Sequence, residues 1–178
     1  MFAVILMLGS FVWVVSELTE LTQGGYTALN STISAIAFAL IAAGVFAIWP
    51  AVGKDIIGRA GIMLVSVGMW VFTLIALLVI GSGVTSDAQI AQSTLFLVAG
   101  TAVTLGALAL GIWIITKSEL PNWVGITLIL VTIFSIGVAF VPALTPYQPF
   151  SNLGLATLLF WLGFSMQVMN QKSKTIVT

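Results

Sequence analysis

The sequence predicts an all-α integral membrane protein, folded as a single six-helix transmembrane domain over residues 1–178. Three observations lead to this fold class. Hydrophobic residues make up 60% of the chain and charged residues only 6%, against roughly 25% charged residues in a soluble domain. The apolar residues form six continuous runs, most of them near the length of about 20 residues that a membrane-spanning helix needs. The five Lys and Arg and the five Asp and Glu lie at the ends of these runs or between them.

The first predicted span, residues 2–16, is the shortest and ends at Ser16 and Glu17. A signal peptide is the alternative for this segment. We expect an uncleaved helix, because no Lys or Arg precedes the apolar run and no Ala-x-Ala cleavage site follows it. We expect Glu17 and Glu20 to lie at a solvated helix end. A calcium site there is not favoured, since calcium takes six or more oxygen ligands.

The second and third spans, residues 29–50 and 58–80, are joined by a short charged connection. Small residues recur at every fourth position of the second span, which predicts a stripe where another helix can approach closely. We expect this stripe to pack inside the bundle, with self-association as the alternative, and we expect Ala43 to lie at a close helix contact. The stripe consists of Ser31, Ala35, Ala39, Ala43 and Ala47.

The fourth and fifth spans, residues 92–116 and 121–142, resemble the second and third in sequence. Ile48-Trp49 recurs as Ile112-Trp113, and Gly61-Ile62 recurs at the same offset as Gly125-Ile126. The matched spans run in the same direction, so we predict a parallel duplication of a two-helix hairpin. The small-residue stripe recurs in the fourth span as Ala99, Ala107 and Gly111.

A Pro-rich, uncharged segment over residues 141–150 precedes the sixth span, residues 151–170. Proline fixes φ and interrupts helices, so we expect a stiff, extended connector. It is either an ordinary connector or a surface that docks to a partner. The candidate partner loop is formed by Pro142, Pro146, Tyr147, Pro149 and Phe150.

The Lys and Arg residues predict the orientation of the helices. With six spans, all five fall on one side of the membrane and none on the other. The positive-inside rule then predicts that both termini lie in the cytoplasm. We expect interfacial aromatic anchors at Trp49, Trp113 and Trp123 on the inner side and at Trp13, Tyr26 and Tyr147 on the outer side. Trp70 and Trp161 are expected to fill space between helices.

The composition also limits the chemistry. The chain has no His and no Cys, so the usual ligands of haem, iron–sulfur clusters and zinc are missing. We expect no ionisable residue inside a span and therefore predict no enzyme, no metal site and no cofactor, although a bound lipid or another apolar molecule is compatible with the sequence. Several hydroxyls could supply polar groups to an apolar pocket, but we expect them to bond to their own helices. They are Ser66, Thr73, Thr101, Thr104, Thr127, Thr132 and Ser135.

One turn carries a resemblance to known proteins. Leu110-Gly111-Ile112-Trp113, followed by Leu120-Pro121-Asn122-Trp123-Val124-Gly125, resembles a group of uncharacterised prokaryotic six-span membrane proteins. That group shows a cytoplasmic Leu-Pro-x-Trp-x-Gly turn, usually with a basic residue where this chain has Asn122. The resemblance implies a six-helix fold in a bacterial or archaeal plasma membrane, and it assigns no catalytic residue.

Two functions are compatible with these features. The first is a non-catalytic accessory or scaffold subunit that packs against a larger membrane complex, with the bilayer and other membrane subunits as partners and no nucleic acid. The alternative is a binding or transport module for a neutral or apolar molecule such as a lipid, a quinone or a carotenoid. In the first case we expect action by association, without coupling to protons or electrons.

Overall fold

The computed structural model describes residues 1–23, 27–82 and 94–175, which are helical apart from short turns. Within this part of the chain, six helices are long and apolar enough to cross a membrane, which confirms the predicted fold class. They are α1 (Phe2–Gln23), α2 (Ala28–Gly44), α4 (Ile56–Ser82), α6 (Thr94–Lys117), α7 (Asn122–Phe140) and α8 (Gln148–Thr175). The shorter elements are η1 (Val45–Ile48) and α3 (Trp49–Val52), which extend the second span, and η2 (Pro142–Tyr147).

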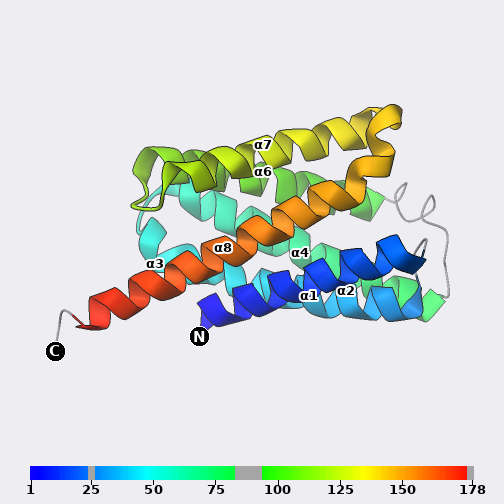
Figure 1. The fold of residues 1–178 in the computed structure, drawn as a ribbon, viewed down its shortest axis with the longest axis horizontal. Coiled ribbons are helices and arrows are strands. Elements are labelled where there is room, and N and C mark those ends of the chain that lie inside the picture. Colours follow the sequence, from blue (N-terminus) through cyan, green and yellow to red (C-terminus); the bar gives the residue numbers. More distant parts are fainter. Residues whose placement is uncertain (24–26, 83–93, 176–178) are drawn as a thin grey trace.

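The six long helices form a ring in chain order. Each packs against the next, and α8 closes the ring by packing against α1. Figure 1 shows α8 crossing between α7 and α1, with the start of α1 and the end of α8 toward the same end of the bundle. We call this the basic end, because the connections and helix ends there carry Lys54, Arg59 and Lys117, and we call the opposite end the acidic end.

Glycines allow neighbouring helices to approach closely. A Cβ on Gly44 of α2 would overlap the backbone of Leu6 in α1, and a Cβ on Gly9 would lie 2.8 Å from the backbone nitrogen of Ile41. On α6, a Cβ on Gly111 would lie 3.0 Å from the carbonyl oxygen of Gly125 in α7. Helices in lipid associate through such close packing, because lipid tails are as apolar as the side chains they would replace.

The predicted small-residue stripe is buried along α6 but only partly along α2. Ala99, Ala107 and Gly111 are buried, whereas Ala39 and Ala43 are half-buried. Ala43, which was expected at a close helix contact, lines a groove with Phe2, Phe46 and Trp70. With 3.6 residues per turn, a four-residue spacing advances about 40° at each step, so the stripe winds around the helix and its members differ in burial. The close contact at Ala43 stays a prediction.

Two segments differ from their predicted form. Helix α1 continues to Gln23, so Glu17 and Glu20 lie within it and not beyond its end. The Pro-rich segment is helical where an extended connector was expected. Only Val141, the residue before Pro142, is extended, and the chain then forms η2 and enters α8 at Gln148. The φ angle that proline imposes also suits a 3₁₀ turn and the first turn of an α-helix.

The predicted duplication has a local difference at the basic end. Helix α2 changes into η1 at Val45, whereas α6 stays α-helical through Trp113 to Lys117. Ile62 is fully buried, while its counterpart Ile126 is exposed. The duplication as a whole stays a prediction.

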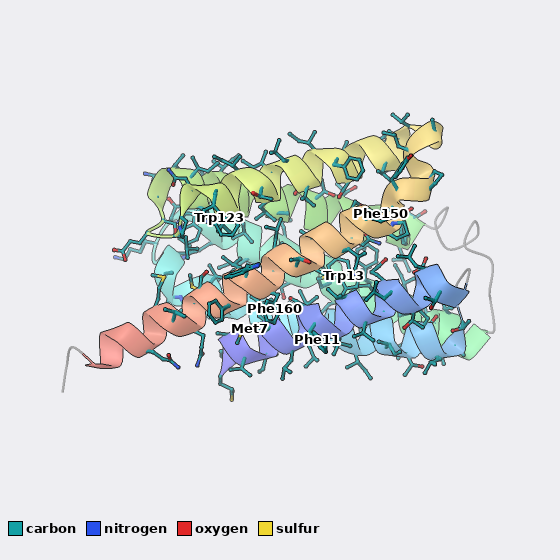
Figure 2. The ribbon with its side chains drawn as sticks, viewed as in Figure 1. Met7, Phe11, Trp13, Trp123, Phe150 and Phe160 are labelled. Carbon is teal, nitrogen blue, oxygen red and sulfur yellow. The ribbon has the colours of Figure 1, made fainter. Side chains whose placement is uncertain are left out.

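The tryptophans occupy three kinds of position. Trp113, expected at the interface, is only 2% exposed, because Gly58 of α4 leaves room for its ring. Trp49 is half-buried beneath the Arg59 guanidinium, which lies 5.2 Å from the ring centroid. Trp123, near the basic end of α7 (Figure 2), is exposed and meets the exposed Trp161 edge to face. Trp161 therefore faces outward and does not fill space between helices.

Three other aromatic predictions have different outcomes. Trp70 is exposed on α4, so it too does not fill the space between helices. Tyr147 is exposed and its ring contacts that of Phe150, which lies at the acidic end of α8 (Figure 2). Tyr26 lies outside the described residues.

The centre of the bundle is filled at the basic end. Val45 and Ile48 of η1 are fully buried, and η1 contacts α1, α4 and α8. Leu6, Ile62 and Leu162 from these three helices are likewise buried in the same core. This packed layer closes the basic half of the bundle and leaves the acidic half as the place for an internal cavity.

Candidate functional site

A cavity of about 410 Å³ lies within the ring, and all six long helices contribute to its walls. Most of the side chains that line it are apolar, including Phe38, Ile75, Val103 and Leu155. Cavities of this size and character are typical of small-molecule sites, in which a few polar groups fix the orientation of the ligand.

The cavity reaches the surface of the bundle between α6 and α7. Among its lining residues, Leu97, Thr101 and Leu105 on α6 are exposed, as are Ala139 and Phe140 on α7. The exposed residues of both helices belong to membrane-spanning segments. The opening therefore faces the region that lipid chains occupy around a membrane protein.

Aromatic rings form one continuous wall of the cavity. Trp13 of α1 meets Phe38 of α2 edge to face, with ring centroids 5.5 Å apart. Phe38 in turn contacts Phe72 of α4 at 5.5 Å, and Phe72 contacts Phe96 of α6 at 5.3 Å. We call these four residues the aromatic wall. Edge-to-face and tilted arrangements of this kind are favourable for neighbouring aromatic rings.

Glu17 lies at the polar end of the cavity, and its position corrects two expectations. The side chain is 5% exposed, although a solvated helix end was expected. It also lies inside the first membrane-spanning helix, although no ionisable residue was expected in a span. The argument that excluded coupling to protons depended on that absence, so it no longer holds.

Two N–H groups hold Glu17 in place. Its Oε1 atom accepts a hydrogen bond from Trp13 Nε1 at 2.7 Å and another from Asn152 Nδ2 at 3.1 Å. Trp13 lies one turn before Glu17 on α1, whereas Asn152 comes from α8. The predicted interfacial anchor Trp13 is thus a buried residue of the site, 5% exposed, because its indole N–H has a partner inside the protein.

Among the residues that the structure describes, two buried oxygens at this end of the cavity have no hydrogen-bond partner. They are Glu17 Oε2 and Ser31 Oγ. Ser31 is 1% exposed and belongs to the residues that line the cavity. Buried polar atoms nearly always have a partner, so two unpartnered oxygens beside one cavity indicate groups that an occupant would satisfy.

A second polar cluster joins α1 to α2 beside the cavity. Ser16 Oγ donates to Asn30 Oδ1 at 2.6 Å and lies 2.6 Å from Ser34 Oγ. Asn30 Nδ2 reaches Glu20 Oε2 at 3.5 Å, and the Asn30 backbone N–H is capped by Thr27 Oγ1. These bonds fix the acidic ends of α1 and α2, which carry Glu17 and Ser31.

Most of the hydroxyls that the sequence offered for a pocket bond to their own helices. Ser135, which lines the cavity, donates to the Val131 carbonyl at 2.9 Å. The same pattern holds for Thr73, Thr127 and Thr132. Ser66 differs, because it donates across to the Ala42 carbonyl of α2. Thr101 and Thr104 line the cavity.

The site residues that sequence reasoning missed are Glu17, Asn152 and the aromatic wall. The spacing of Trp13 and Glu17 was an available signal, since residues four apart share a helix face. The contact between α1 and α8, from residues 135 positions apart, had no comparable signal. Among the residues that the structure describes, no group of three or more His, Cys, Asp or Glu could hold a metal ion.

The fold and the cavity define a multi-pass α-helical membrane protein with an internal site that is closed toward its basic end. No family model, curated protein or solved structure matches this chain.

Proposed function

We propose that this protein is a non-catalytic membrane protein that binds a largely apolar small molecule in the cavity. The observation that carries the proposal is the combination of a 410 Å³ apolar cavity with an opening between α6 and α7. An accessory subunit that acts only through its outer surface has no need of such a space. Of the two predicted functions, the cavity favours the binding or transport module.

The asymmetry of the bundle supports the same proposal. The basic half is filled by η1 and the residues around it, whereas the acidic half is hollow. Protein interiors are normally close-packed, and a large unfilled space forfeits packing contacts. An apolar occupant would restore those contacts, and the lateral opening gives it a route from the bilayer.

Gly100 provides a sharp test. It lines the cavity, and a Cβ at this position would meet nothing within 4 Å, so Gly100→Leu fills the cavity without a backbone clash. Gly81 of α4 is the matched control, because a Cβ there also meets nothing and the residue does not line the cavity. The probe is adamantane diazirine, a compact neutral photolabel, applied to the purified protein and located by mass spectrometry.

We expect labelling of the aromatic wall and of neighbouring cavity residues in the wild type and in the control variant Gly81→Leu. In Gly100→Leu the cavity labelling should fall strongly, while labelling of the lipid-facing surface stays unchanged. Equal cavity labelling in all three proteins, or none in the wild type, would contradict the proposal.

The accessory-subunit function is a second candidate, supported by an aromatic cluster on the outer surface. Trp123 of α7 and Trp161 and Phe164 of α8 are all exposed, and Trp161 contacts each of the other two rings edge to face. Large aromatic side chains are enriched where proteins meet. Purification in a mild detergent, followed by identification of co-eluting subunits, tests this candidate. Loss of a subunit in Trp161→Ala would support it, and elution of the wild type alone would contradict it.

A further inference from the structure

The two unpartnered oxygens define the chemistry that the polar end of the cavity lacks. In the described part of the chain, Glu17 Oε2 and Ser31 Oγ are buried without a hydrogen-bond partner, and both residues line the same cavity. A buried acceptor that is left unpaired is costly, and a carboxylate left unpaired is more so. An occupant that brings N–H or O–H donors would remove this cost.

The orientation of Glu17 is set before any occupant arrives. Trp13 and Asn152 both donate to Oε1, so the carboxyl group is held from α1 and from α8 at once. The second carboxyl oxygen, Oε2, is therefore left as an acceptor for an occupant. Preorganised acceptors of this kind bind donors well, because little side-chain freedom is lost on binding.

Within the described part of the chain, the basic residues lie away from Glu17. Lys54, Arg59 and Lys117 are in the connections and helix ends of the basic end, and Lys172 and Lys174 are among the last residues of α8, toward the same end. Glu20, one turn further along α1, carries the same sign of charge as Glu17. An occupant with a positive charge would therefore supply the counter-charge that the described part of the chain does not place near the Glu17 carboxyl group.

The aromatic wall suits a cation as well as an apolar body. Trp13, whose indole N–H binds Glu17, is the first ring of the wall, so the rings continue directly from the carboxyl group. The faces of aromatic rings attract cations, Trp most strongly. The remaining rings, Phe38, Phe72 and Phe96, extend across α2, α4 and α6 as an apolar surface.

We propose that the cavity binds an amphipathic amine, with its protonated amino group on Glu17 Oε2 and Ser31 Oγ and its apolar body along the aromatic wall. This inference rests on the proposed function and specifies its ligand class. An ammonium group has several N–H donors and a positive charge, and so it can satisfy both acceptors and pair with the carboxylate. An alcohol would supply a donor without the charge, and a carboxylic acid would bring a second negative group.

The test compares ligands that share one apolar body. They are 4-phenylbutylamine, its trimethylammonium analogue, 4-phenylbutan-1-ol and 4-phenylbutanoic acid. Apparent dissociation constants are obtained from the ligand-dependent rise in melting temperature of the purified protein in one detergent. We expect the primary amine to bind about ten- to hundredfold more tightly than the alcohol, since hydrogen bonds to charged groups contribute more than neutral ones. The trimethylammonium analogue should bind less tightly than the amine, because it has no N–H donor.

Variants assign the preference to the two oxygens. Glu17→Gln keeps the side-chain shape and removes the charge, so the preference for the amine over the alcohol should disappear. Ser31→Ala should reduce the preference by a few-fold. Glu119→Gln is the control, because Glu119 is an exposed carboxyl group at the basic end that does not line the cavity, and it should retain the wild-type preference.

Failure of this inference is distinguishable from failure of the proposed function. If the photolabel enters the cavity and Gly100→Leu blocks it, but the alcohol binds as tightly as the amine, the site takes a neutral molecule and the amine proposal is wrong. The amine proposal is also wrong if Glu17→Gln retains the preference for the amine. The comparison of ligands on the wild type needs no variant, so it decides the question even where a substitution prevents folding.

Discussion

At the scale of single residues, the main finding is that one carboxyl group is built into the wall of an apolar cavity. Glu17 lies one helical turn after Trp13 and receives a second N–H donor from Asn152 of α8. The three side chains join the first and last long helices of the ring. The bond from Asn152 thus contributes both to the site and to the closure of the bundle.

Replacement of Asn152 by Leu should destabilise the protein by about 1–2 kcal/mol, because Glu17 loses a donor while the volume of the side chain is nearly kept. Hydrogen bonds between membrane helices are often worth less than this, but here the remaining partner is a buried carboxyl group. The matched control is Asn122→Leu at the exposed start of α7, where we expect little change. The free energy of unfolding, measured by titration with sodium dodecyl sulfate, checks both. Equal effects of the two substitutions would show that the bond does not hold α8 to α1.

At the scale of elements, glycines determine how closely neighbouring helices approach. Gly44 lies against the backbone of Leu6, and Gly111 lies against Gly125. The backbone contact at Gly44 also lies where α2 changes into η1, the element that fills the basic end of the ring. Contacts of this kind set the width of the bundle and so the space that remains for the cavity.

Gly44→Ala should destabilise the protein by about 1–3 kcal/mol, because the added methyl group overlaps main-chain atoms of α1 that cannot move aside as a flexible side chain would. Gly81→Ala is the matched control with the opposite expectation. Its methyl group meets nothing, and alanine favours the helix by up to about 1 kcal/mol over glycine. Melting temperatures in detergent distinguish the two. A variant Gly44→Ala as stable as the wild type would mean that α1 and α2 pack less closely than described.

The sequence was sufficient for some elements and not for others, and the difference has a physical basis. The length and continuity of the apolar runs predict the six helices, because a bilayer requires those properties of any spanning helix. The same rule could not place the end of α1, since polar residues such as Glu17 can stay helical where other helices cover them. A contact such as Glu17 with Asn152 depends on which helices become neighbours, and apolar periodicity does not encode that in a membrane. The spacing of small residues along α2 likewise did not show that Ala39 and Ala43 are half-buried while Ala35 is buried.

At the scale of the whole molecule, the bundle has two unlike halves. The basic half is packed around η1 and contains the start of α1 and the end of α8 (Figure 1), and the acidic half contains the cavity and its opening. If the positive-inside rule holds for this chain, the cavity lies in the half of the membrane away from the cytoplasm. An occupant would then exchange with the outer leaflet. The orientation of the bundle therefore determines whether the site exchanges molecules with the outer or the inner leaflet.

We predict that the basic end faces the cytoplasm, and the absence of cysteine from the chain makes this directly measurable. Two single-cysteine variants mark the two ends of the bundle. Tyr147→Cys replaces the exposed last residue of η2 at the acidic end. Glu119→Cys replaces an exposed residue in the turn between α6 and α7 at the basic end. In intact cells, a membrane-impermeant maleimide should label Tyr147→Cys and leave Glu119→Cys unlabelled. After permeabilisation both should react, which controls for accessibility of the two thiols.

The physical reason is that Lys and Arg in short connections resist transfer across the membrane, and all of them lie toward the basic end. Labelling of Glu119→Cys alone in intact cells would show the opposite orientation, with the basic end outside and the cavity in the cytoplasmic half of the membrane.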